Sequence, residues 1–235
     1  MENEYGRFLR MADAIDNLAA KYNEAPFTYS LCQWGWENPM NWAPRIAQAW
    51  RIDNDIKPFW ANIASILNLQ QFSYLSTNFY QHGDLDMLEV GNSGQGAPIG
   101  NLTLAEQRTH FTAWCLLKSH LLIGTDLRNA TNETLAILGN KELIAINQDP
   151  HEGASLAPFR IGLQPDYSTR TYNATHPPPY WAGNSSYGAV FMVINTLSTS
   201  QKMGFNLTEN WAVRAGRQYR VRDMWKHEDV GIAVR

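Results

Sequence analysis

The chain begins with the hydrophobic spacing of an amphipathic helix. Apolar side chains recur every three or four positions near the start, at Tyr5, Phe8, Leu9, Ala12, Ile15 and Ala19. This spacing places them on one helical face. The pattern then changes to the alternation typical of a half-buried strand in FTYSL (residues 27–31).

Strand-like and helical segments alternate up to about residue 150. The predicted strands are FTYSL, AWRI (49–52), DMLEVG (86–91) and HLLIGTDL (120–127). Helices are predicted around 41–48, at 56–69 and after Thr103, which forms a T-x-x-E capping box with Glu106. Two short helices follow, one ending at Gly139 and the next running through Leu143. Asp84 and Asp86 are predicted at the entrance of the third strand.

Beyond Pro150 the helical period disappears. The strand-like segments there are APFRIGL (157–163), YGAVFMVINTL (187–197), QKMGFNL (201–207) and YRVRDMW (219–225). The sequence therefore predicts a parallel βα part over residues 1–150 and an antiparallel β domain over 151–235. Four βα units are half of an eight-stranded barrel, and an open doubly wound sheet fits the same count. The spacing leaves these two alternatives open.

Composition narrows the classes of partner. The chain is 44% apolar and only 17% charged, with a net charge of -3 and no basic run. We therefore expect neither a nucleic-acid partner nor binding to an anionic membrane. Few charges together with many aromatic residues fit a neutral polar ligand. The histidine spacing matches no zinc motif, so we expect no metal, and no segment is long enough to span a membrane.

Two features concern the cellular compartment. Cys32 and Cys115 are compatible with either a disulfide or free thiols. Glycosylation sequons occur at Asn101, Asn129, Asn132, Asn173, Asn184 and Asn206. Six sequons favour the secretory route, yet residues 1–16 contain no apolar signal region.

Chemistry-bearing residues follow the predicted strands. They are Cys32, Gln33, Trp34, Trp36, Arg51, Asp53, Asp55, Met87, Glu89, Asp126 and Arg128. The carboxyl ends of parallel strands meet at one edge, where active sites lie. Tryptophan faces stack on sugar rings, carboxylates accept hydroxyl hydrogen bonds and arginine donates them. This mixture indicates a carbohydrate pocket.

Asp55 is the candidate proton donor. Glycosidic hydrolysis needs two carboxyl groups, and the acid is one whose pKa is raised by desolvation. Asp55 precedes Ile56 and lies near Trp60, so we expect it to be desolvated. The alternative is that Asp53 or Asp55 caps a helix beginning at Ile56.

Five ordered motifs carry a family resemblance. They are YSLCQWG (29–35), WRIDNDI (50–56), DLDMLEVGN (84–92), HFTAWCLLKSHLLIGTDLRN (110–129) and IAINQDP (144–150). In order and spacing they resemble glycoside hydrolase family 27, the secreted α-galactosidases and α-N-acetylgalactosaminidases, with the fungal members looking most similar.

The resemblance implies a (β/α)8 barrel followed by an antiparallel β domain, and a retaining mechanism without a cofactor. It implies that Asp55 is the general acid/base and that Arg51 and Asp86 bind the sugar, with Met87 beside Asp86. Gln33 would shape the pocket at the sugar 2-position, and Trp34 is a weaker inference. The family pattern W-N-D-P-D-M-L-E is QHGDLDMLE here, so the proline is replaced by Leu85.

The family nucleophile belongs to a K-x-D strand end that this chain does not contain. By the resemblance, residues 27–126 correspond to barrel strands five to eight. We therefore expect a truncated chain, the second half of the barrel plus the β domain, that is inactive alone. The full-length family member is secreted.

Three functions remain open. The first is hydrolysis of terminal α-D-galactosyl residues of oligosaccharides or galactomannan, with α-N-acetylgalactosaminidase specificity as a variant that the Gln33 amide disfavours. The second is non-catalytic galactose binding by a fragment that completes a barrel with a partner, and the third is an inactive remnant. The oligomeric state is left open.

Overall fold

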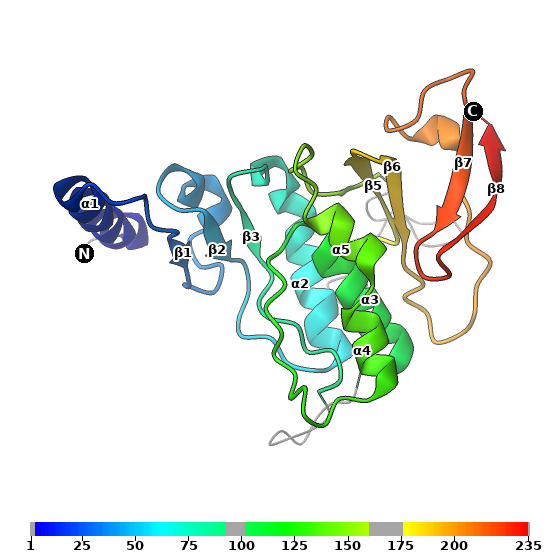
Figure 1. Cartoon of the computed structure of the whole chain (residues 1–235), viewed down its shortest axis with the longest axis horizontal. Helices are drawn as coiled ribbons and strands as arrows, with labels where there is room; N and C mark the ends of the chain where they lie inside the picture. Colours follow the sequence, from blue (N-terminus) through cyan, green and yellow to red (C-terminus); the bar gives the residue numbers. More distant parts are fainter. Residues whose placement is uncertain (1–2, 93–101, 160–175, 235) are drawn as a thin grey trace.

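A computed structural model describes residues 3–92, 102–159 and 176–234. Figure 1 shows an elongated arrangement, with helix α1 (Glu4–Tyr22) at one end and the strand pair β7 (Gln218–Asp223) and β8 (Glu228–Val234) at the other. Between them, helices pack beside a small parallel sheet. None of the helices in these three ranges is long and apolar enough to cross a membrane.

The parallel sheet is built from short strands in the order β1-β2-β3. Their bounds are Ser30–Leu31 for β1, Ala49–Arg51 for β2 and His82–Asp84 for β3. A parallel bridge between Leu88 and Ile123 continues this arrangement. The predicted parallel βα organisation is confirmed, and all carboxyl ends of these strands face one edge.

The third and fourth predicted strands are wrong in detail. β3 lies at His82–Asp84, so Asp84 ends the strand instead of preceding it. Asp86 then has a φ of 74°, which breaks the extended conformation predicted for 86–91. The segment 120–127 contributes only the bridge at Ile123. Polar β3 pairs along its whole length with β2, and this tertiary pairing makes it a strand despite its weak apolar pattern.

The helices follow local signals closely. Their bounds are Trp60–Ser73 for α2, Leu104–Leu116 for α3, Asn132–Leu138 for α4 and Lys141–Asn147 for α5. The predicted capping box is confirmed, because Thr103 and Glu106 bond each other's backbone N–H groups. Two 3-10 turns, Pro39–Asn41 and Ala43–Arg45, replace the helix predicted at 41–48.

Helix α2 begins four residues later than predicted. Its N-cap is Phe59, which supplies no side-chain bond. Pro58 explains the delay, since a proline disfavours the helical conformation in the residue before it. Neither Asp53 nor Asp55 therefore caps this helix, and the capping alternative is wrong.

The core lies between the sheet and the helices that cover it. Its largest fully buried side chains include Trp50 of β2, Ile63 and Leu67 of α2, and Phe111 and Trp114 of α3. Cys115 is also buried there, whereas Cys32 is exposed, and both are free thiols. The disulfide alternative is therefore wrong.

The C-terminal part is antiparallel, as predicted. Strands β4 (Ala157–Pro158), β5 (Tyr180–Ser185) and β6 (Gly188–Val193) form one sheet, and β7 pairs with β8. β5 and β8 were not predicted, and residues 201–207 form no strand. Most of the predicted strand at 157–163 lies outside the described residues.

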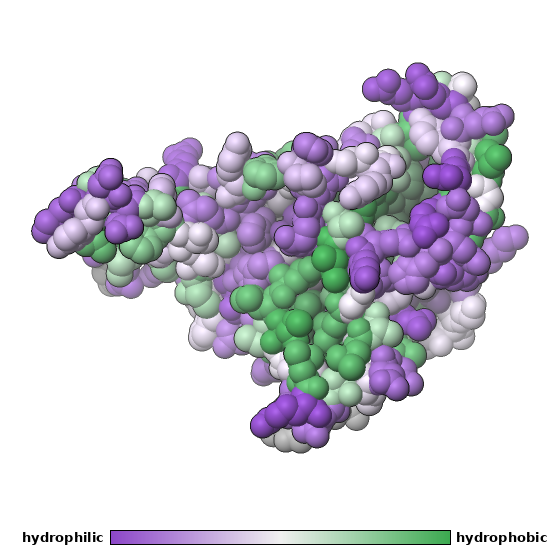
Figure 2. Space-filling view, viewed as in Figure 1, coloured by the Kyte–Doolittle hydropathy of each residue, from purple (hydrophilic) through white to green (hydrophobic). Residues whose placement is uncertain are grey.

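Apolar side chains are exposed on one face of the described part of the chain. Figure 2 shows it over the segment that leads into α4, and its exposed side chains include Leu122, Ile123, Leu127 and Leu135. These residues follow or flank the Leu88–Ile123 bridge, the last parallel pairing of the sheet.

The β7–β8 hairpin is attached to helix α5 by ionic contacts. Arg222 donates two hydrogen bonds to Glu142, at 2.7 and 2.8 Å, and His227 contacts the same carboxylate at 2.8 Å. The hydrogen bonds from Arg222, with a further contribution from His227, lower the pKa of Glu142 from 4.5 to about 2.

This lowered pKa predicts an acid-sensitive contribution to stability. A carboxyl with a depressed folded-state pKa stabilises the fold fully above its unfolded pKa, and that contribution is lost as the pH falls from about 4.5 towards about 2. We expect Glu142→Gln to remove this part of the pH dependence in urea unfolding. Glu24→Gln, an exposed control, should leave the pH dependence as it is; identical curves for Glu142→Gln and wild type would contradict the prediction.

Candidate functional site

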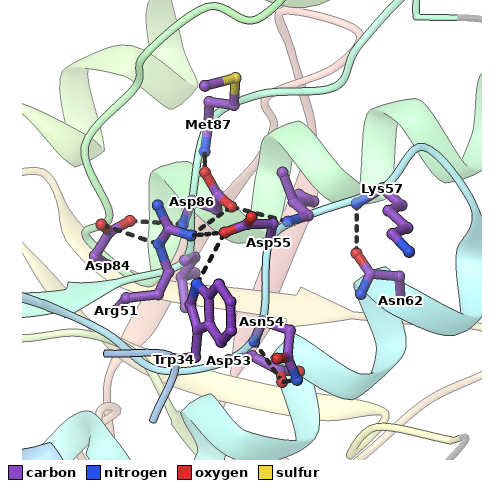
Figure 3. Close-up of polar contacts among 12 residues, drawn as sticks. Trp34, Arg51, Asp53, Asn54, Asp55, Lys57, Asn62, Asp84, Asp86 and Met87 are labelled. Atoms are coloured by element: carbon purple, nitrogen blue, oxygen red, sulfur yellow. Dashed lines mark hydrogen bonds and ion pairs between the residues drawn. The ribbon is translucent and has the colours of Figure 1, made fainter. Parts of the chain in front are cut away.

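Arg51 lies at the carboxyl end of β2 and connects three carboxylates. Its Nη1 donates to Asp86 Oδ2 at 2.8 Å and to Asp55 Oδ1 at 3.0 Å, and its Nε donates to Asp84 Oδ2 at 3.3 Å (Figure 3). Burial alone would lower the pKa of Arg51, but Asp84 and Asp86 outweigh it and raise that pKa. We call these four residues the Arg51 cluster.

Strand register brings the cluster together. Arg51 and Asp84 are paired neighbours on β2 and β3, although they are 33 positions apart. Burial would raise the pKa of Asp84, but hydrogen bonding from His120, the Asp86 N–H and the charge of Arg51 lower it. Asp84 is therefore an ionised, buried carboxylate.

Asp86 is fixed from several sides. One carboxylate oxygen accepts from Ile56 N at 2.8 Å as well as from Arg51, and the other accepts from Met87 N at 2.7 Å. Its carbonyl oxygen accepts from the Trp114 indole at 2.6 Å. With only 7% of its side chain exposed, Asp86 holds one orientation towards Arg51.

Asp55 is the exposed member of the cluster. The Trp34 indole donates to its Oδ1 at 3.1 Å, the oxygen that also accepts from Arg51. Its side chain is 69% exposed, so the predicted desolvation is wrong in this chain. Among the described residues, none hydrogen-bonds the second oxygen, which is free to meet a ligand.

Other predicted site residues lie around the cluster without joining it. The amide of Gln33 donates to Trp36 O, and its oxygen is buried without a partner among the described residues. Met87 is 42% exposed, and its side chain points away from Arg51 in Figure 3. Glu89 accepts from Asn92 at 2.5 Å, and burial raises its pKa.

Two predicted neighbours are placed elsewhere. Asp53 accepts from Ser65 of α2 at 2.8 Å, and Figure 3 shows it apart from Arg51. Asp126 pairs with Arg128 at 2.8 Å on the surface. The idea that all carboxylates gather at one rim is therefore right only for Asp55, Asp84 and Asp86.

Two histidines that were not predicted as site residues lie next to the cluster. His120 Nε2 lies 3.0 Å from Asp84 Oδ1, and His82 Nε2 lies 3.4 Å from His120 Nδ1. Burial, and then the neighbouring His120, lower the pKa of His82 to about 4. No spacing rule connects residues 82 and 120, so only the folded chain reveals the pair.

Two further predictions concern the glycosylation sequons and metal binding. Asn129, Asn132, Asn184 and Asn206 are exposed, while Asn101 and Asn173 lie outside the described residues. Within the described ranges no three acidic, histidine or cysteine side chains are grouped to hold a metal ion.

Comparison with known families decides the assignment. The model described as Alpha galactosidase A matches residues 18–149, and the Alpha galactosidase C-terminal beta sandwich domain matches residues 175–234. The chain belongs to the α-galactosidase family, glycoside hydrolase family 27. The suspected resemblance is thus confirmed.

Two curated relatives carry the name α-galactosidase B. A protein of Aspergillus fumigatus named "Probable alpha-galactosidase B" is 37% identical over 235 residues, covering 96% of this chain and 52% of that protein. One of the same name from Talaromyces emersonii is 40% identical over 193 residues, covering 82% of this chain and 40% of that protein. The chain spans about half the length of these α-galactosidase relatives.

Solved α-galactosidase structures share the fold. Alpha-galactosidase I from Mortierella vinacea superimposes with a TM-score of 0.80 at 28% identity, covering 98% of this chain and 58% of that one. The Saccharomyces cerevisiae α-galactosidase with raffinose gives 0.77 at 26% identity, covering 94% and 52%. These relatives have a barrel followed by a β domain.

Proposed function

We propose that the chain carries the sugar-binding and proton-donating part of an α-galactosidase, an enzyme that hydrolyses terminal α-D-galactosyl residues of oligosaccharides or galactomannan. The observation that carries this proposal is the Arg51 cluster at the carboxyl ends of parallel strands. A buried, oriented Asp86 and a half-exposed Trp34 offer hydroxyl acceptors and a stacking face to a sugar.

The same proposal assigns the fold. Residues 1–150 would be the second half of a (β/α)8 barrel and residues 151–235 its antiparallel β domain. Two observations support this: the parallel pairing ends at Ile123, and an apolar surface is exposed there (Figure 2). An uncovered sheet edge beside apolar side chains is a site for further pairing.

In the proposed mechanism Asp55 is the general acid and then the general base. Its free oxygen would protonate the departing glycosidic oxygen, while Arg51 and Trp34 hold the other oxygen in place. A retaining glycosidase needs a second carboxylate as nucleophile. Asp84 and Asp86 are unsuited to that role because each is only 7% exposed and both oxygens of each already accept hydrogen bonds. We therefore propose that residues 1–235 bind galactose but hydrolyse almost nothing alone.

Turnover tests the catalytic half of this proposal. We expect the purified chain to show no steady hydrolysis of an aryl α-galactoside above the uncatalysed rate, because the covalent step lacks its nucleophile. Absorbance of the released phenol measures it. Steady hydrolysis that Asp55→Asn abolishes would show that this chain is a complete enzyme.

Binding tests the other half. We expect Asp86→Ala to weaken galactose binding at least about tenfold in calorimetric titration, because it removes a charged acceptor that the fold pre-orients. Asp126→Ala, a surface carboxylate outside the cluster, should bind like wild type. Equal affinity of Asp86→Ala and wild type would refute the proposed sugar site, whereas binding without turnover fits the chain as a galactose-binding fragment.

The proposal also includes a preference between two sugars. The bulk of Gln33 favours galactose over N-acetylgalactosamine, so titration with both sugars should show tighter binding of galactose.

The four exposed sequon asparagines support glycosylation on a secretory route. A mobility shift on treatment with an endoglycosidase, after expression in a eukaryotic secretory host, tests this.

A further inference from the structure

The histidine pair beneath the Arg51 cluster forms a directional hydrogen-bond chain. Asp84 accepts from Arg51 and from the Asp86 N–H at 2.6 Å, so it is an ionised acceptor. His120 Nε2 faces this carboxylate at 3.0 Å and must therefore carry a proton. Neutral His120 then has an acceptor at Nδ1.

His82 faces the other ring nitrogen of His120. Its Nε2 lies 3.4 Å from His120 Nδ1, and two nitrogens at that distance need one proton between them. With a neutral His120, its Nδ1 accepts this hydrogen bond and His82 Nε2 donates it. The chain thus runs from His82 to His120 to Asp84, and Asp84 holds Arg51 at Nε.

We infer that His120, oriented by His82, is a positioning residue that fixes Asp84 and through it the sugar-binding Arg51 and Asp86. This inference rests on the proposed galactose site, which His120 itself does not touch. Its position is specific: His120 Nε2 lies 3.0 Å from the same Asp84 oxygen that accepts the Asp86 N–H.

The pair also makes the site sensitive to protonation. A proton added to His120 Nδ1 places N–H against N–H unless His82 changes tautomer. Two imidazolium rings whose facing nitrogens lie 3.4 Å apart would repel each other. A cationic His120 would compete with Arg51 for Asp84. Within the described ranges, Arg51 also pairs with Asp55 and Asp86. We therefore expect affinity for the sugar to fall on acidification.

The first test needs no sugar. In ¹⁵N–¹H spectra of the whole chain we expect both histidines as the Nε2–H tautomer, and we expect His120→Ala to shift the Arg51 Nε–H resonance. His151→Ala removes an exposed imidazole far from the site in sequence and should leave that resonance in place. An unchanged Arg51 resonance in His120→Ala, or an Nδ1–H tautomer of His120, would overturn the inference.

The second test measures galactose affinity at about pH 8 and about pH 5, across the range in which histidine titrates. Wild type should bind more weakly at the lower pH. His120→Gln, which keeps a donor for Asp84 but does not titrate, should bind within about threefold of wild type at the higher pH with a flatter profile. His120→Ala should bind about tenfold more weakly, and thermal melts establish that each variant is folded.

The outcomes separate the two proposals. Absence of galactose binding by the wild type, with the expected tautomers and Arg51 shift, would end the sugar-site proposal and leave the positioning of Arg51 supported. Binding by the wild type with the same pH profile in His120→Gln would end the inference and leave the sugar site intact.

Discussion

Replacing Arg51 by leucine should destabilise the chain by about 3–5 kcal/mol, the cost of removing one partner from a buried ionic network. Asp84 and Asp86 are each only 7% exposed, so without Arg51 two carboxylates would remain buried and facing each other. Their mutual repulsion would raise both pKa values or open the edge of the sheet. Urea unfolding monitored by tryptophan fluorescence measures the change.

The matched control is Arg128→Leu. Arg128 also pairs with an aspartate, Asp126, but its side chain is 87% exposed, and exposed pairs add little to stability. We expect its unfolding midpoint to equal that of wild type. Arg51→Lys should fall between the two, because an ammonium group lacks the planar fork that serves three carboxylates at once. Equal midpoints for both leucine variants would show that the cluster does not stabilise this fold.

Replacing Gly35 by alanine should cost about 2–5 kcal/mol, the combined order of left-handed backbone strain and overpacking. Gly35 has a φ of +78°, and a Cβ there would lie 2.2 Å from the carbonyl oxygen of Ile52. Neither atom can move aside easily, since Ile52 directly follows β2 and its N–H donates to Asp84 O. The loop carrying Trp34 would have to shift.

The displaced loop gives this prediction a second readout. Trp34 contacts Asp55, so Gly35→Ala should lower both the unfolding midpoint and the affinity for galactose. Gly204→Ala is the control, because a Cβ there has no heavy atom within 4 Å and its φ lies outside the left-handed region. If Gly35→Ala melts and binds like Gly204→Ala, the close packing of this loop on β2 is not required.

Local signals predicted much of the fold. The Thr103–Glu106 box opens α3 because each partner lies within one helical turn of the other. The start of α2 was predicted too early although Pro58 carried the relevant signal. Asp84 was placed before a strand because apolar alternation favoured 86–91, whereas β3 owes its conformation to pairing with β2.

The candidate site was likewise predicted only in part. The resemblance pointed to Arg51, Asp55 and Asp86, and the structure brings these three side chains together. It did not point to His120 or to the Trp114 indole bond on Asp86 O. These contacts join residues 28–36 positions apart, and no periodicity within a helix or strand encodes them.

The sequence alone determined three things: the alternation of helices with parallel strands, the change to antiparallel strands, and the family motifs. Each of them depends on residues that are close together in the chain. The tertiary structure alone decided which carboxylates share Arg51, that Asp55 is exposed, and that two histidines support Asp84. Strand register and the turn at Asp86 set those positions, because they determine which distant side chains can come within hydrogen-bonding distance.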